Sequence, residues 1–66
     1  MERTWYICFE DKQLGKKLFA GPNTGFYSDF QSANAFSKPE VKKALPGMKK
    51  HYKEKRLKAI QIILRG

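Results

Sequence analysis

The amino-acid sequence predicts a small α+β domain, in which one helix packs on one face of a small antiparallel sheet. Two segments, residues 3–10 and 57–65, are rich in the β-branched, aromatic and other apolar residues that form strands. Between them, residues 41–52 carry apolar side chains at helical spacing. Turn-forming residues separate these segments, and the predicted order of elements is strand, strand, strand, helix, strand (βββαβ).

Size and composition limit the chain to a single domain, residues 1–66. A domain of this size buries only about 60% of its unfolded surface, so its core must consist of few residues. The chain is 41% hydrophobic and 30% charged, which is ordinary for a globular protein and too apolar for a disordered one. No apolar run approaches the roughly 20 residues of a membrane span, and the first residues do not resemble a signal peptide. We therefore expect a cytoplasmic protein without a membrane partner, either a monomer or a small homo-oligomer.

The first two strands are predicted to form a hairpin. Residues 5–10 alternate between two faces, with Trp5, Ile7 and Phe9 on one of them. The segment "DKQLGK" offers a chain reversal, and "KKLFA", residues 16–20, is a plausible returning strand. Either face of this hairpin could be the one that meets the helix, so the pattern leaves the direction of Trp5 open.

The middle of the chain is predicted to be irregular. "GPNTG", residues 21–25, is a loop, and it lacks the Gly-Lys-Ser/Thr ending that a phosphate-binding P-loop requires. Ser28 or Asp29 could cap a single helical turn, and a short third strand is expected at Ala35 and Phe36. The last strand is expected at Ile60–Leu64, well buried.

The helix is predicted to begin with a capping box. Ser37 and Glu40 have the spacing at which each side chain bonds the backbone N–H of the other residue. An apolar stripe follows at i, i+3, i+4, i+7 and i+11, and it keeps its phase through Pro46 and Gly47. Either one helix is kinked at Pro46, or a first helix ends at Leu45 and a second begins at Pro46. The stripe consists of Val41, Ala44, Leu45, Met48 and Tyr52.

The positive charge is confined to the second half of the chain. Residues 1–37 hold four basic and four acidic side chains, whereas residues 38–66 hold ten basic and two acidic, which accounts for the whole net charge of +8. A solvated helical face usually mixes the two signs, and this one does not. Such a surface suits nucleic acid, an anionic membrane or an acidic protein.

The basic residues are therefore the first candidate site. A nucleic acid, DNA or RNA, is the expected partner, bound with weak sequence specificity through phosphate contacts. The alternative is a protein-binding module that docks on an acidic host protein or self-associates through its sheet. The candidate phosphate-binding residues are Lys42, Lys43, Lys49, Lys50, Lys53, Lys55 and Arg56.

A second candidate interface is the sheet face opposite the helix. If Trp5 faces the helix, then Tyr6, Phe19 and Tyr27 lie on a face that a single helical layer leaves uncovered. Aromatic side chains on an open sheet can stack on bases or form a protein interface.

Catalytic chemistry is not expected. His51 is the only histidine and has no obvious carboxylate or nucleophile beside it, so we interpret it as a solvated helical residue. Cys8 is the only cysteine, cannot form an intrachain disulfide, and fits a buried strand position. One Cys and one His fall short of the four ligands of a zinc site. The sequence predicts no enzyme activity, no cofactor and no metal.

The segment "FYSDFQSANAFSKPE", residues 26–40, resembles small α+β proteins encoded by phages and prophages. Those proteins combine an opening "WYI"-type strand, a Ser-Asp turn, Phe-Ser-x-x-Glu at the start of the helix and a closing apolar strand. The resemblance implies an origin in a mobile element. "FSKPE" also resembles the helix start of the βββα arm-binding domains of phage and transposon integrases, which place their sheet on DNA. This chain departs from them in its last strand and in having only Lys16 and Lys17 as basic residues on the returning strand of the hairpin.

Overall fold

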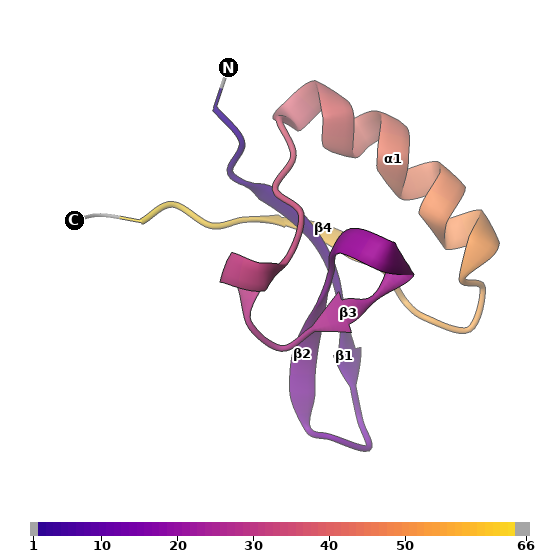
Figure 1. The fold of residues 1–66 in the computed structure, drawn as a ribbon. Helices are drawn as coiled ribbons and strands as arrows, with labels where there is room; N and C mark the ends of the chain where they lie inside the picture. Colours follow the sequence, from indigo (N-terminus) through magenta and orange to yellow (C-terminus); the bar gives the residue numbers. More distant parts are fainter. Residues whose placement is uncertain (1, 65–66) are drawn as a thin grey trace.

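The structure, a computed structural model that describes residues 2–64, has the expected α+β architecture with the order βββαβ. The strands form one antiparallel sheet in the order β3-β2-β1-β4, and α1 lies across one face of it (Figure 1). The elements are β1 (Trp5–Asp11), β2 (Lys16–Ala20), β3 (Phe26–Tyr27), α1 (Lys38–His51) and β4 (Lys58–Gln61), with 3-10 turns η1 (Pro22–Thr24) and η2 (Phe30–Ser32).

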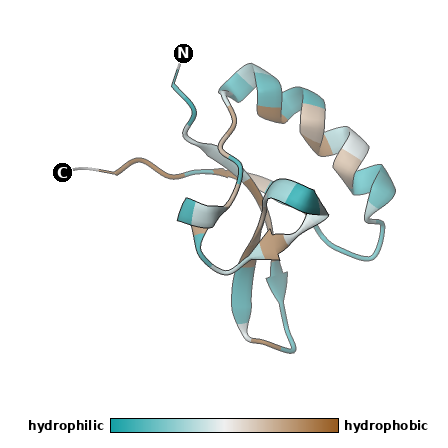
Figure 2. Ribbon diagram, in the orientation of Figure 1, coloured by the Kyte–Doolittle hydropathy of each residue, from teal (hydrophilic) through white to brown (hydrophobic). Residues whose placement is uncertain are grey.

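The hydrophobic core lies between α1 and the sheet. Ile7 and Phe9 of β1 meet Val41 of the helix there, and Trp5 packs at the edge of the same cluster. Trp5 therefore faces the helix, which settles the direction that the sequence pattern left open. Hydrophobic segments alternate with hydrophilic ones along α1 (Figure 2), as expected of a helix with one buried face. The stripe residues Ala44, Leu45, Met48 and Tyr52 all pack against this core.

The β1–β2 reversal is fixed by its own side chains. The Asp11 carboxylate accepts hydrogen bonds from the backbone N–H groups of Gln13 (2.9 Å) and Leu14 (3.1 Å). Gly15 then adopts φ +64°, a left-handed conformation that glycine reaches without steric penalty. Cys8 lies opposite Phe19, and Glu10 lies opposite Lys17, in the resulting register.

The helix runs without interruption from Lys38 to His51, with Pro46 inside it. The alternative of two helices that meet at Pro46 is therefore wrong. Proline lacks the N–H that would bond the carbonyl of Lys42, a defect that costs about 3 kcal/mol in a helix interior. Pro46 and Gly47 are both exposed, so the defect faces solvent, where water can bond the free carbonyl, and the buried stripe is continuous.

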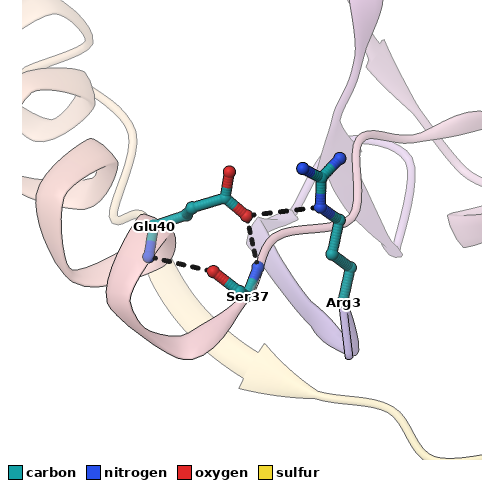
Figure 3. Close-up of polar contacts among 3 residues, drawn as sticks. All are labelled: Arg3, Ser37 and Glu40. Atoms are coloured by element: carbon teal, nitrogen blue, oxygen red, sulfur yellow. Dashed lines mark hydrogen bonds and ion pairs between the residues drawn. The ribbon is translucent and has the colours of Figure 1, made fainter. Parts of the chain in front are cut away.

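The start of the helix is the expected capping box (Figure 3). The backbone N–H of Ser37 donates to the Glu40 carboxylate at 2.9 Å, and the backbone N–H of Glu40 donates to Ser37 Oγ at 3.3 Å. Arg3 Nε lies 3.5 Å from the same carboxylate oxygen, which ties the segment before β1 to the helix start. Hydrogen bonding to Ser37, by its backbone N–H first and then by its side chain, lowers the pKa of Glu40, so the folded chain favours its charged form.

Replacing the capping serine should destabilise the helix by a measurable amount. Ser37 is buried, and Ser37→Ala removes the acceptor for the Glu40 N–H, with an expected loss of about 1 kcal/mol in the free energy of unfolding. Ser28→Ala, at an exposed position outside any helix, is the matched control. Urea unfolding monitored by circular dichroism gives both values, and equal midpoints for the two variants would contradict the assignment.

The position of the third strand differs from expectation. The third strand is Phe26–Tyr27, paired with β2, whereas Phe36 makes only an isolated bridge with Trp5. Asp29, one of the two expected caps, caps the turn η2 by accepting from the N–H of Gln31 at 3.0 Å.

The last strand is shorter and less buried than the sequence suggested. Its pairing with β1 covers residues 58–61, and one further hydrogen bond joins the N–H of Ile62 to the carbonyl of Thr4. Beyond that point the chain leaves the edge of the sheet, and Ile63 and Leu64 are 63% and 72% exposed. The closing strand is therefore confirmed, but its expected extent, Ile60–Leu64, and its full burial are wrong: β4 ends at Gln61, and Ile63 and Leu64 lie beyond it.

The sheet face opposite the helix is not open, contrary to expectation. Phe30, from η2, folds over it, with its ring centroid 5.6 Å from that of Tyr6 and 6.4 Å from that of Phe19. Phe19 is only 8% exposed, and Cys8 beside it is fully buried. Burial raises the pKa of the Cys8 thiol, so the residue is a neutral core side chain, as interpreted from the sequence.

Candidate nucleic-acid interface

The outer face of α1 gathers most of the candidate lysines. Lys42 and Lys49 are seven residues apart and form one row, and Lys43 and Lys50 form the neighbouring row. Lys53 follows directly after the helix, whose C-cap is Tyr52. All five side chains are exposed, and none of them packs against the core. We call Lys42, Lys43, Lys49, Lys50 and Lys53 the lysine face.

The positive charge of the lysine face is not neutralised by the rest of the fold. Within residues 2–64, none of its five side chains forms an ion pair with a carboxylate. Basic residues elsewhere do meet acidic ones: Lys58 pairs with Glu10 at 3.8 Å, and Lys17 lies opposite Glu10 in the sheet register. The excess charge counted from the sequence is therefore concentrated on the helix and its C-terminal end.

Part of this charge also stabilises the helix. Lys49 and Lys50 occupy the last turn, where cations interact favourably with the negative end of the helix dipole. This effect explains a basic last turn but not Lys42 and Lys43, which lie in the first half of the helix.

Lys55 lies apart from the lysine face and has a packing role. Its Nζ lies 4.5 Å from the ring centroid of Phe9 and 5.3 Å from that of Phe26, and its side chain is half-buried. The Phe26 ring in turn meets Phe9 and Tyr52 edge-on, each at 5.2 Å. The ammonium group therefore lies over two core aromatic rings, Phe9 and Phe26, a contact that no local sequence pattern predicts.

Lys55→Ala should lower stability more than it lowers binding to a polyanion. Loss of the cation–π contacts is expected to reduce the free energy of unfolding by roughly 0.5–1 kcal/mol. Lys53→Ala, at an exposed position two residues earlier, should leave stability unchanged and weaken binding. Thermal unfolding and heparin affinity chromatography compare the two variants, and the reverse pattern would place Lys55 in the binding surface.

Arg56 is exposed but lies in a region of mixed charge. It lines a groove of about 770 Å³ at the end of the β1–β2 hairpin, together with both signs of side chain. Glu10, Asp11 and Glu54 border this groove opposite Lys12 and Lys58. A phosphate in the groove would meet three carboxylates, so Arg56 is a weaker candidate than the lysine face.

Tyr27, expected on an open sheet face, instead supports the η1 loop. Its hydroxyl donates to the carbonyl of Pro22 at 3.1 Å. Its ring packs against Gly21 and Gly25, where a Cβ atom would lie 2.5 Å and 3.0 Å from the tyrosine side chain. Only glycine fits this close approach at Gly21. Tyr6 is half-buried under Phe30, so Tyr6, Phe19 and Tyr27 do not form the open aromatic surface that the sequence suggested.

Residues suited to other chemistry are dispersed. His51 is exposed, with its ring edge-on to Tyr52 at 4.6 Å. Across the described chain, residues 2–64, no three His, Cys, Asp or Glu side chains come close enough to hold a metal ion. The same residues include no helix with the length and apolarity needed to cross a bilayer.

The lysine face is thus the largest set of candidate residues that the fold brings together. Comparison of the chain with protein-family models, curated proteins and solved structures finds no match in any of the three.

Proposed function

We propose that the protein binds nucleic acid through the lysine face, without strong sequence preference. The observation that carries the proposal is the set of five exposed lysines of one sign, none of them paired with a carboxylate within residues 2–64. Like charges at this spacing repel one another and reduce helix stability, so a polyanion that neutralises them would bind with a favourable electrostatic contribution.

The mode of binding follows from the chemistry of lysine. An ammonium group on a flexible stem contacts a phosphate as a point charge and does not read base edges. The proposed mode places α1 against the phosphate backbone. It differs from the sheet-on-DNA mode of the integrase arm domains that the chain resembles, because here Lys16 and Lys17 lie opposite Asp11 and Glu10.

The alternative is a protein-binding module that docks on an acidic host protein or self-associates through its sheet. Self-association through the sheet has less support, because the Phe30 ring packs against Phe19 and the Tyr27 hydroxyl bonds the η1 loop. The proposal includes no catalytic step and no cofactor.

A salt titration tests the proposed function. About five phosphate contacts predict a slope near −4.5 in a plot of log K against log salt, and hence roughly a 500-fold loss of affinity between 50 and 200 mM salt. Fluorescence anisotropy with labelled DNA, RNA and heparin at several salt concentrations gives the slope. Affinity that does not change with salt, or binding to heparin alone, would contradict the proposal.

A further inference from the structure

A second groove runs along the flank of α1 beside the η1 loop. Its volume is about 640 Å³, within the range of about 300–1,000 Å³ that small ligands occupy. The apolar side chains that line it, on the edge of the core, are those of Ala20, Phe36, Ala44, Met48 and Tyr52. Polar groups from the loop, Asn23 and Thr24, and from Asn34 border it on the side away from the helix.

Gly47 lies in the middle of the helix wall of the groove. The wall consists of Lys43, Gly47 and His51, which are spaced four residues apart. A Cβ atom built on Gly47 meets no other atom within 4 Å, so the space that a side chain would occupy at this position of the groove wall is empty. Glycine is the poorest helix former after proline, and Gly47 lies inside the helix and not in a turn.

The loop wall is held in an unusual backbone conformation. Asn23 and Thr24 both have positive φ, 59° and 56°, which residues with a side chain rarely adopt. The loop is fixed by the hydrogen bond from the Tyr27 hydroxyl to Pro22 and by a backbone bond from Gly21 N–H to the carbonyl of Gly25 at 2.9 Å. The two polar side chains therefore sit on a braced loop at the edge of the groove.

Charge complementarity identifies the class of ligand. Among residues 2–64, no carboxylate lines this groove, whereas its helix wall carries Lys43 and His51, and Lys50 of the lysine face follows one turn after Gly47. The hairpin-end groove near Arg56, in contrast, is lined by three acidic and four basic residues, so its charges are nearly balanced. An apolar surface lined by the amides Asn23 and Asn34 and by the ammonium group of Lys43 fits a flat, partly polar ring attached to a phosphate.

We propose that this groove takes an unpaired base of a single-stranded nucleic acid while the adjacent phosphates contact Lys43 and Lys50. This inference rests on the proposed function and extends it: besides binding phosphates by charge, the protein prefers single strands to duplexes. A base in a duplex is stacked on both sides and cannot enter a groove, whereas a base in a single strand can pack on Met48 and Tyr52. Its hydrogen-bonding edge would then face Asn23 and Asn34.

Substitution of Gly47 tests the inference. Wild-type protein should bind an oligo(dT) strand about tenfold more tightly than a duplex of the same length at equal salt. Gly47→Leu places an apolar side chain over the groove without a change in charge, and it should reduce oligo(dT) affinity to the duplex level while heparin affinity stays the same. Gly47→Ala, which adds only a methyl group in open space, should retain the preference and raise the melting temperature.

A matched control separates the groove from the helix surface. Pro46→Leu adds the same side chain one residue earlier, at an exposed position that does not line the groove, and should keep the single-strand preference. Equal affinities for oligo(dT) and duplex in the wild type, or equal effects of the two leucine variants, would overturn the groove assignment and leave the lysine face standing. Absence of binding to oligo(dT), duplex and heparin alike would reject both.

Discussion

Reversing three charges of the lysine face, Lys49→Glu, Lys50→Glu and Lys53→Glu together, is expected to abolish nucleic-acid binding and leave the fold intact. The change lowers the net charge from +8 to about +2 and replaces three proposed phosphate contacts with three repulsions. None of the three side chains is buried, and none is ion-paired within the described chain. Anisotropy at 50 mM salt should show a loss of at least 100-fold, with an unchanged far-UV spectrum.

Two further variants control for effects on stability and net charge. Glutamates in the last turn oppose the helix dipole at a cost of about 0.3–1 kcal/mol each, so the corresponding Lys→Gln triple variant removes the charges without that penalty. Lys12→Glu, at the exposed tip of the hairpin, is compared with Lys50→Glu as a single reversal of equal size. If Lys12→Glu weakens binding as much as Lys50→Glu, net charge and not the lysine face is responsible.

Ile7→Ala is expected to be the most destabilising single substitution in the sheet. Ile7 is fully buried at the centre of β1, where it meets Val41 and Leu57. Truncation of a buried isoleucine costs about 2–5 kcal/mol, because the apolar contact is lost and a cavity remains. A domain of this size has only a small stability margin, so the variant should be largely unfolded at 37 °C.

Ile63→Ala provides a control with identical chemistry at an exposed position. Ile63 is 63% exposed beyond the end of β4, and its truncation should change the free energy of unfolding by less than about 0.5 kcal/mol. Urea denaturation followed by Trp5 fluorescence measures both variants. Similar losses at the two positions would mean that the chain beyond β4 packs against the core in solution.

The parts of the fold that local patterns determine were predictable. The capping box, the helical stripe and the hairpin depend on residues within a few positions of one another, and the structure confirms each. The strand at Phe26–Tyr27 was missed because two residues carry too little pattern, and its existence depends on pairing with β2. The extent of β4 depends on where its partner stops, which the alternation of its own residues does not reveal.

The candidate site was predictable in the same limited sense. The two lysine rows follow from helical geometry, so Lys42, Lys43, Lys49 and Lys50 could be grouped before the structure was known. The cation–π contact of Lys55 joins residues more than 25 positions apart, which no local pattern encodes. The groove beside Gly47 depends on positive φ in a loop that the sequence marks only as rich in turn formers.

The strand order β3-β2-β1-β4 also has a consequence for the order of events during synthesis. One edge of β1 pairs with β2, which follows it directly, whereas the other edge waits for β4, which starts 47 residues after β1 ends. At a rate of about 5–20 residues per second, that interval lasts roughly 2–10 s. Throughout it, the nascent hairpin carries an unpaired edge beside Ile7 and Phe9, a template for pairing with other chains. Pairing of β4 with β1 covers this edge and so ends the period in which the nascent chain can pair with other chains.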